Sequence, residues 1–259
     1  MTESNGTEGR KLSFLKKLSL LLFPPRCVYC RSITERSSTP PALCPKCRGL
    51  YERERTAPCI ECGNPADTCT CTFPYRGAVT DYFCVAPYSK SQNTVSKKIV
   101  LTAKSKRLGY LFDFMADQIV GLYRLERHIE EKQKLGIPLV VTYVPRNPDT
   151  VCECGFDQAK ELAERVAKRF NLECIAALRH KRGVSAQKEM NLAMRYENAE
   201  NSYCEGKDIS LVRWRNIIII DDLITTGATV SACSSILRRN GAAKITAVTF
   251  AKNMRTDLR

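Results

Sequence analysis

The chain has 259 residues and a hydrophobic fraction of 44%, which is ordinary for a globular protein and long enough for one α/β domain with a small appendage. Its formal net charge of +14 favours anionic partners, namely phosphorylated metabolites, nucleic acid or an anionic membrane surface, without choosing among them. Because His128 and His180 are the only histidines, the composition argues against a histidine-based metal centre or a catalytic triad.

The first 22 residues are predicted to form a segment apart from the body of the protein. Residues 10–23 have a basic start and a short apolar run that ends at Pro24 and Pro25. The run is too short to span a bilayer, and no small-residue cleavage site follows it. We therefore expect a cytoplasmic protein without a transmembrane segment. The run is either a helix that packs on the body or a peripheral membrane contact.

Eight cysteines predict a zinc-binding, cysteine-rich module over residues 23–75. They form four closely spaced pairs, which are Cys27 and Cys30, Cys44 and Cys47, Cys59 and Cys62, and Cys69 and Cys71. A Cys-x-x-Cys turn lets two thiolates bind one tetrahedral zinc, and two such turns complete a four-sulfur shell. Since four thiolates leave no open position for a substrate, the predicted zinc is structural.

The ligand pairing stays open at this point. A sequential assignment places the first four cysteines on one zinc and the last four on another, whereas an interleaved assignment mixes the pairs. The second set is weaker because one residue separates Cys69 from Cys71, so one or two ions are compatible with the sequence. Redox cysteines are the alternative. The metal-ligand spacing and the lack of an export signal favour a reducing compartment over disulfides.

The body of the protein is predicted over residues 76–259, after a hinge at residues 73–77. Residues 79–88 predict a strand or hairpin, residues 91–103 a helix, and residues 109–131 one long helix. Between the helices, residues 104–107 form a basic cluster that suits an anion. Residues 138–145 are an apolar run typical of a buried parallel strand, and Arg146 follows its carboxyl end.

A further helix is predicted over residues 159–170, and the basic residues 179–187 follow it. This loop contains Arg182 and Gln187, and Arg195 comes shortly after it. A mobile loop of this composition can close over a polyanion and bring positive charge to a developing pyrophosphate. A plain solvent loop is the alternative.

The most specific pattern lies at residues 217–230. Four isoleucines predict a strand buried on both faces, and Asp221 and Asp222 follow at its carboxyl end, where open α/β sheets bind ligands. The next residues offer hydroxyl groups, a glycine free to take positive φ and the first amides of a helix, which together can hold a phosphate. They are Thr225, Thr226, Gly227, Ala228 and Thr229. The helix ends near Gly241, and residues 244–250 predict the next strand.

A carboxylate pair directly before a phosphate loop suits a sugar phosphate. The acids can accept hydrogen bonds from neighbouring hydroxyls while the loop holds the terminal phosphate. No Gly-Lys-Ser or Gly-Lys-Thr is present, so a Walker-type nucleotide site is not expected. The alternative is an ordinary buried strand followed by a polar turn.

This pattern closely resembles the phosphoribosyl pyrophosphate signature of type I phosphoribosyltransferases. The whole order of features, from about Leu20 to Ala251, resembles the ComF family of phosphoribosyltransferase-like proteins, which is associated with natural competence and DNA uptake. The resemblance rests on the cysteine pairs, the basic cluster at Lys104, Val144 with Pro145, residues 155–159, Gln187 with Arg195 and Asn198, and the phosphate signature.

The resemblance implies a type I phosphoribosyltransferase fold, a Rossmann-like parallel sheet flanked by helices, behind an N-terminal zinc finger. It implies that Asp221 and Asp222 hold the ribose hydroxyls of phosphoribosyl pyrophosphate, bound with magnesium, and that residues 225–229 hold the 5-phosphate. Residues 144–146 would form the pyrophosphate loop, with Lys104 nearby. The family usually has arginine before its Gly-Phe-Asn-Gln motif, whereas Cys154 stands there in this chain, which puts an anion role at that position in doubt.

Two functions of different class follow. The first is a phosphoribosyltransferase that transfers a pentosyl group to an acceptor that the residues do not identify. The second is a non-catalytic, single-stranded DNA-binding competence protein, with DNA-translocation proteins as partners and a sugar-phosphate site that is regulatory or vestigial. Basic residues around the second cysteine pair favour nucleic acid, and a solvated basic face is the alternative. They are Lys46, Arg48, Arg53 and Arg55.

Overall fold

The computed structural model describes residues 22–35, 37, 40–69, 71, 77–89, 92–182 and 192–253. The predicted N-terminal helix or membrane contact lies almost wholly before these residues. Gln187 and the glycine-containing part of the basic loop also lie outside the described residues. The acidic pair, the phosphate loop and all eight paired cysteines lie within them.

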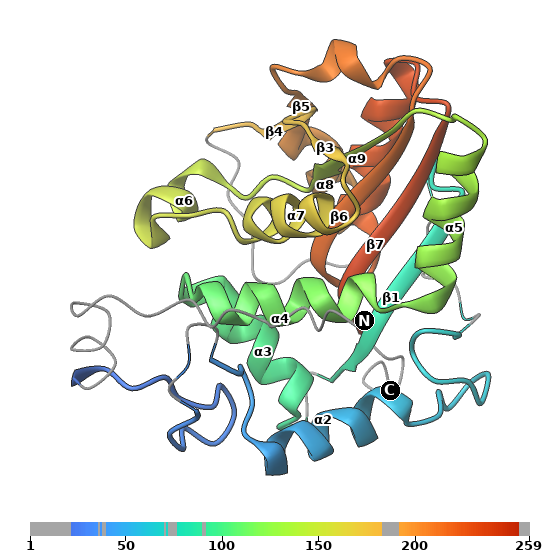
Figure 1. Ribbon diagram of the computed structural model, residues 1–259. Coiled ribbons are helices and arrows are strands. Elements are labelled where there is room, and N and C mark those ends of the chain that lie inside the picture. Colours follow the sequence, from blue (N-terminus) through green and yellow to red (C-terminus); the bar gives the residue numbers. More distant parts are fainter. Residues whose placement is uncertain are drawn as a thin grey trace, which may run out of the picture.

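Five parallel strands form the central sheet of the described chain. Their order is β1 (Asp81–Tyr88), β7 (Lys244–Asn253), β6 (Asn216–Ile224), β2 (Leu139–Tyr143) and β3 (Glu173–Cys174). Helices cover both faces of this sheet, so the predicted α/β class is confirmed (Figure 1). Because β6 is the middle strand, the residues at its carboxyl end are flanked by β7 and β2.

The four isoleucines of β6 alternate between the two faces of the sheet. Ile218 and Ile220 belong to the core shared with α4 (Gly109–Val120) and α7 (Gln158–Arg169). Ile217 and Ile219 belong to the core shared with α9 (Ala228–Arg239). Figure 1 shows α4 and α7 in front of the sheet and α9 behind it. The strand is therefore buried on both faces, as its sequence predicts.

The remaining elements lie around these layers. The helices are α2 (Pro45–Thr56), α3 (Val95–Ser105), α5 (Tyr123–Lys134), α6 (Pro148–Cys154), α8 (Leu192–Ser202) and the 3-10 helix η1 (Ile209–Val212). The strands β4 (Leu178–His180) and β5 (Tyr203–Glu205) form a small antiparallel sheet. Within the described ranges, no helix is both long enough and apolar enough to cross a bilayer.

The helix predicted as one over residues 109–131 is two helices, so that expectation was wrong. Helix α4 ends at Gly121, whose N–H donates to the carbonyl of Asp117. Leu122 then takes an extended conformation (φ −75°, ψ 102°) and starts α5 in a new direction. The break lets Leu122, Leu125 and Ile129 all reach the core, and glycine, a poor helix former, is the residue at the turn.

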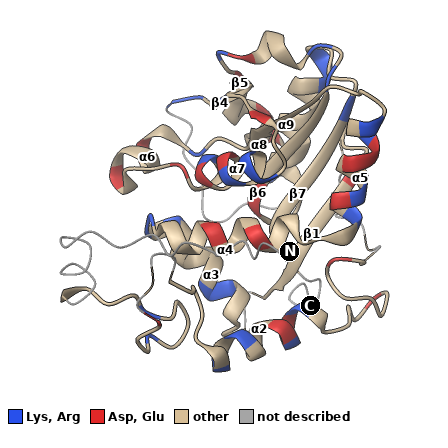
Figure 2. Ribbon diagram, in the orientation of Figure 1, with Lys and Arg blue, Asp and Glu red and all other residues tan. Residues whose placement is uncertain are grey.

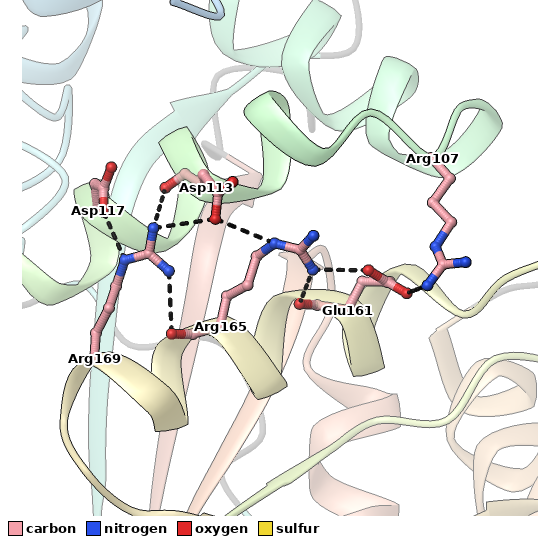
Figure 3. Close-up of polar contacts among 6 residues, drawn as sticks. All are labelled: Arg107, Asp113, Asp117, Glu161, Arg165 and Arg169. Atoms are coloured by element: carbon pink, nitrogen blue, oxygen red, sulfur yellow. Dashed lines mark hydrogen bonds and ion pairs between the residues drawn. The ribbon is translucent and has the colours of Figure 1, made fainter. Parts of the chain in front are cut away.

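A ladder of ion pairs joins α4 to α7. Its members are Arg107 just before α4, Asp113 and Asp117 on α4, and Glu161, Arg165 and Arg169 on α7, and Figure 3 shows them in a row between the two helices. Arg165 is the bridge, since it lies 2.7 Å from Glu161 on its own helix and 3.3 Å from Asp113 on α4. Burial raises the pKa of Glu161, but the hydrogen bonds from the two arginines beside it lower it overall. The ladder holds α7 against α4.

The cysteine-rich part of the chain is packed into the main core. Tyr51 of α2 is fully buried, with its ring 5.4 Å from that of Phe114 on α4 and 6.3 Å from that of Phe250 on β7. Cys27 and Cys47 belong to the same hydrophobic cluster. The proposed boundary near residue 75 stays a prediction, since residues 72–76 are outside the described chain.

Candidate functional site

Asp221 and Asp222 lie inside β6, whose pairing with β7 continues through Asp221 opposite Thr249. The sequence places the acids after the strand, whereas the strand runs on to Ile224. Continued pairing draws both side chains into the protein, so that Asp221 is 9% and Asp222 is 3% exposed. The N–H of Asp222 donates to Oδ1 of Asp221 at 2.8 Å. The pair is therefore fixed and largely dry.

The charges at the acidic pair are only partly compensated. Burial, followed by repulsion from Asp222, raises the pKa of Asp221 well above its ordinary value. Lys104, at the end of α3, places its Nζ 3.6 Å from Oδ2 of Asp222, and this carboxylate raises the pKa of the lysine. Oδ2 of Asp222 is buried and has no hydrogen-bond partner among the described residues. Such an atom costs stability unless a ligand pairs with it.

The phosphate loop leads directly into α9. Gly227 takes a left-handed conformation (φ 81°), and no side-chain hydrogen bond caps this helix. The N–H of Ala228 has only a long contact of 3.4 Å with the hydroxyl of Thr226, whereas the N–H of Ser231 is used within the helix. The opening amides of a 12-residue helix and its dipole thus form an anion-binding position beside the acids.

Arg146 stands at the neighbouring strand end, immediately beyond β2. Its Nη2 donates to the carbonyl of Lys104 at 2.9 Å, and its backbone N–H donates to Oδ2 of Asp157 at 2.8 Å. Nη1 of Arg146 is buried and lacks a hydrogen-bond partner in the described part of the chain. A buried cationic nitrogen without a partner suits an anionic ligand atom.

Asp157 has a role that the sequence did not assign to it. Besides accepting from Arg146, it caps α7 by accepting the N–H groups of Ala159 and Lys160. Burial is the largest influence and raises its pKa. The signal for the cap was present, because aspartate directly before a helix is a preferred N-cap. The contact with Arg146 joins residues 11 apart and could not be read from the sequence.

Helix α8 also reaches the phosphate loop, through a contact that the sequence analysis did not predict. The hydroxyl of Tyr196 donates to the carbonyl of Thr226 at 2.7 Å. Arg195 is the preceding residue on this helix and is half-buried. The contact fixes one side of the loop while leaving the amides of α9 for another partner.

The eight paired cysteines form two groups of four, as in the sequential assignment. The sulfur atoms of Cys27, Cys30, Cys44 and Cys47 lie within 4.8 Å of one another, and so do those of Cys59, Cys62, Cys69 and Cys71. Interleaved pairing is thereby excluded. Sγ of Cys30 lies 3.7 Å from Sγ of Cys44 in the first group. In the second group, Sγ of Cys59 lies 3.8 Å from Sγ of Cys71, and Sγ of Cys62 lies 3.5 Å from Sγ of Cys69.

Both cysteine groups fit a zinc ion. A tetrahedron of sulfur atoms around zinc has edges of about 3.8 Å, which matches the observed distances. In the first group, hydrogen bonds from Ser32 lower the pKa of Cys30 to about 6, which favours the thiolate that binds a metal, whereas burial raises the pKa of Cys47. Each group can hold one structural zinc, with no side chain left over for substrate chemistry.

Comparison with known proteins bears on the same region. Residues 155–259 match the family model described as phosphoribosyl transferase domain. Competence protein F of Haemophilus influenzae is 24% identical over 149 residues, which cover 54% of this chain and 62% of that protein. DNA utilization protein YhgH of Escherichia coli K12 is 27% identical over 120 residues, which cover 46% of this chain and 51% of that protein. The chain thus spans about half of the length of these relatives.

The chain thus contains a phosphoribosyl transferase-like domain and is similar to proteins named for competence and DNA utilization. Its phosphoribosyl transferase domain includes β6, both acids and the phosphate loop, whereas Lys104, Arg146 and the cysteine-rich module precede the matched residues. A solved structure of an adenine phosphoribosyltransferase is also similar, with a TM-score of 0.36 and 17% identity over 57% of this chain and 76% of that chain. That likeness is too slight to support a further conclusion.

The fold of this chain brings most of the predicted site residues to one edge of the sheet. Asp221, Asp222, Lys104 and Arg146 are linked by the contacts above, and residues 225–229 adjoin them. Val144 and Pro145 are buried just before Arg146, so their side chains are covered. Arg182 is exposed and makes no hydrogen bond or ion pair with a described residue.

Proposed function

We propose that this chain binds phosphoribosyl pyrophosphate with magnesium at the carboxyl edge of β6 and transfers the phosphoribosyl group to an acceptor. The ribose hydroxyls donate to Asp221 and Asp222, and the amides of residues 225–229 hold the 5-phosphate. Arg146 and Lys104 face the pyrophosphate, with Arg182, Gln187 and Arg195 as further ligands from the neighbouring loop and helix. The acceptor is left open, because no group at this edge selects one.

One observation carries the proposal. A buried carboxylate oxygen of Asp222 and a buried guanidinium nitrogen of Arg146 both lack hydrogen-bond partners in the described chain, on either side of Lys104. An anion alone would satisfy Arg146 and the α9 amides but would repel Asp222. A hydroxyl group alone would satisfy only Asp222. A phosphorylated sugar offers both kinds of group in one ligand. The contacts of Lys104 with Asp222 and with Arg146 place the two protein groups along one edge of the sheet.

The chemistry follows from where the charges lie. The bond between the anomeric carbon and the pyrophosphate oxygen breaks, its electron pair leaves with pyrophosphate, and the acceptor's lone pair forms the new bond at that carbon. Arg146 and Lys104 stabilise the negative charge that develops on the leaving group, and the buried carboxylates favour the cation-like sugar. Magnesium, whose preferred ligands are oxygens, neutralises further charge on the pyrophosphate when it is bound.

A titration of phosphoribosyl pyrophosphate in the presence of magnesium tests this function. The double variant D221N/D222N keeps the shape of both side chains and is expected to lose at least about a hundredfold in affinity. The matched control is E130Q/E131Q, which removes the same two charges from exposed positions on α5. Equal affinity in the wild type and D221N/D222N would remove the assignment. Release of pyrophosphate with a panel of nucleophiles then tests turnover.

We propose in addition that the protein acts in the handling of incoming DNA, because both relatives carry names from competence or DNA utilization. DNA-translocation proteins are its expected partners. We place it in the cytoplasm, where thiol pairs that fit zinc stay reduced, with peripheral membrane contact through its basic N-terminal segment as a possibility for the same location.

Single-stranded DNA binding is a second candidate function, and one surface favours it. Trp214 is 75% exposed and takes a positive φ of 64°, which is rare for a bulky residue and marks strain. The backbone N–H of Trp214 donates to the carbonyl of Gly241, and the guanidinium of Arg213 lies 5.7 Å from the indole ring. The indole is thus held outward by the backbone, in a form suited to base stacking.

The surroundings of Trp214 are basic. Figure 2 shows lysine and arginine gathered at the end of the sheet where β6 and β7 begin, opposite to the acidic pair. The cations next to Trp214 in the chain or on the adjoining turn are Arg213, Arg215, Arg238, Arg239 and Lys244. Only Arg215 among them is paired with an acid, Glu173 at 3.2 Å, among the described residues. An aromatic platform within such a surface fits a single strand better than a duplex.

Binding of fluorescent oligonucleotides across salt concentrations tests this second function. W214A is expected to weaken single-strand binding about tenfold without a change in the unfolding free energy. Y123A is the control, since Tyr123 is 67% exposed and has Arg127 at 5.8 Å from its ring but lies on α5, where three glutamates offset the basic residues. Absence of single-strand binding by the wild type at low salt would sink this reading.

A further inference from the structure

A carboxylate from the cysteine-rich module caps the helix that carries Lys104. Glu54 lies in the last turn of α2, and its Oε1 accepts the N–H of Val95 at 2.7 Å. Its Oε2 accepts both the N–H and the hydroxyl of Ser96 at 3.0 Å. Val95 and Ser96 are the first two residues of α3. This part of the cap thus comes from a residue 41 positions away in the chain, in addition to the helix's own N-cap residue Thr94.

The Glu54 cap is the main support for the start of α3. The hydroxyl of Thr94 accepts the N–H of Lys97 at 3.2 Å, whereas the N–H groups of Val95 and Ser96 donate to Glu54. An anion at this position also lies at the positive end of the helix dipole. Since the opening N–H groups of a helix have no partner within it, losing Glu54 would leave two donors unsatisfied.

The far end of α3 is the substrate edge. The helix has 11 residues, so it is a rod of about 16 Å that moves as one body. Lys104 lies in its last turn and uses two groups there: its Nζ faces Asp222, and its carbonyl accepts from Nη2 of Arg146. A shift of α3 along its axis therefore changes the distance between Lys104 and Asp222. It also lengthens or shortens the hydrogen bond from Arg146 to the Lys104 carbonyl.

The cysteine-rich module fixes the other end of this connection. Helix α2 starts at the second cysteine pair, with Cys44 as its N-cap residue and Cys47 buried in its first turn. Tyr51 anchors the middle of α2 in the main core, and Glu54 follows one turn later. The first cysteine group, α2, Glu54 and α3 thus form a continuous line of contacts to Lys104.

We propose that Glu54 is a positioning residue for the substrate edge: through its cap on α3, the cysteine-rich module sets the place of Lys104 and, through the Lys104 carbonyl, that of Arg146. The ligand in this statement rests on the proposed function, whereas the mechanical link does not. Loss of the metal from the first cysteine group is expected to weaken ligand binding by the same route.

Electrostatics and positioning predict opposite changes in the affinity for an anionic ligand when Glu54 is substituted. Removing a negative charge from the module makes the distant anion site more positive, so charge alone strengthens the binding of a polyanion or leaves it unchanged. Loss of the cap moves Lys104 and Arg146 from their places, so positioning weakens binding. The direction of the change therefore separates the two causes.

The matched pair of variants is E54Q and E52Q. Both remove one negative charge from α2, but Glu52 pairs with Arg48 and Arg55 of its own helix at 3.1 Å, and no side-chain hydrogen bond or ion pair joins it to the described residues of α3. A glutamine at position 54 keeps one acceptor and turns an amide NH₂ toward the second N–H donor, so it breaks the cap without a change in size. E54D, which keeps both acceptors, should restore part of the wild-type behaviour.

Two measurements on the full chain decide the proposal. The first is the affinity for phosphoribosyl pyrophosphate with magnesium, measured well below the unfolding temperature: E54Q is expected to bind about tenfold more weakly, with E52Q equal to the wild type. The second is hydrogen exchange, in which E54Q is expected to lose protection over the whole of residues 95–107.

The outcomes are distinguishable. If the wild type binds no phosphoribosyl pyrophosphate, the proposed function fails, and exchange at residues 104–107 alone then decides the mechanical link. If the wild type binds and E54Q binds as well or better, the positioning role is overturned. It is also overturned if exchange in E54Q rises only at residues 95–98 while residues 104–107 keep their protection.

Discussion

The carboxyl edge of the sheet and the cysteine-rich module differ in how the groups that carry their predicted roles are paired. In the module, Glu54 is fully used by α3, and the thiols form two closed groups of four. At the sheet edge, Oδ2 of Asp222 and Nη1 of Arg146 are buried without a hydrogen bond to a described residue, and the only charge beside Oδ2 among the described ion pairs is Lys104 at 3.6 Å. The module also keeps such atoms, one each on Thr34, Tyr51 and Asp67. The difference indicates that substitutions of the module's cysteines mainly cost folding, whereas substitutions at the edge mainly cost binding.

The largest expected effect is on folding, from the first cysteine group. Cys47 is 2% exposed and lies in the main core, whereas Cys62 of the second group is only half-buried. C47S should lower the unfolding free energy by more than about 3 kcal/mol, since a metal ligand and a core side chain are lost together. C62S should cost less. Urea unfolding with metal analysis of the purified proteins checks the order, and a reversed order would contradict the comparison.

The next largest effect, a loss of binding, is expected at the edge. K104M removes the cation next to Asp222 and should weaken binding of phosphoribosyl pyrophosphate between about tenfold and a hundredfold. K106M is the control, because Lys106 is exposed two residues further on. Isothermal titration of both variants measures the contrast, and equal losses would mean that charge on α3 matters without regard to position.

The ion ladder between α4 and α7 should affect folding alone. E161Q removes two charged hydrogen bonds and is expected to lower the unfolding free energy by about 2 kcal/mol. The folded-state pKa of Glu161 is lowered, so its stabilisation is present above the ordinary carboxyl pKa and is lost as pH falls through the folded value. The difference between wild type and E161Q should therefore shrink in acid. A constant difference across pH would contradict the role of the charge.

The smallest effect is expected at the start of α3. T94A removes the hydroxyl that accepts the N–H of Lys97 and should cost about 1 kcal/mol. The cost stays small because Glu54 continues to hold the first two N–H groups. A loss as large as that of C47S in thermal unfolding would mean that Thr94, and not Glu54, is the main cap.

Local patterns predicted most of the fold. The isoleucine run of β6, the apolar run of β2 and the spacing of α7 and α9 all gave elements close to those observed, because burial on both faces or on one helix stripe leaves a clear periodicity. The single helix over residues 109–131 was wrong because its apolar spacing continues across Gly121, and only the tertiary contacts of Leu122 reveal the turn.

The site was predicted as a set of residues but not as a set of contacts. The acids, the phosphate loop and Arg146 could be found from their places after predicted strands. The contacts of Tyr196 with Thr226, of Asp157 with Arg146, and of Glu54 with α3 join distant parts of the chain, and a single sequence carries no signal for them. Gln187 is outside the described residues, so its role stays a prediction.

The central claim is that the acidic pair lowers the stability of the fold and serves to bind the ligand. The variant D221N tests both parts, through its unfolding free energy and its affinity for phosphoribosyl pyrophosphate. Burial raises the pKa of Asp221, so above the unfolded value of 3.8 the ionised side chain costs stability, and this cost grows until pH passes the folded value. At neutral pH we predict that D221N raises the unfolding free energy by about 1–2 kcal/mol and weakens phosphoribosyl pyrophosphate binding roughly a hundredfold. A variant that is less stable than the wild type and binds the ligand equally well would contradict the account.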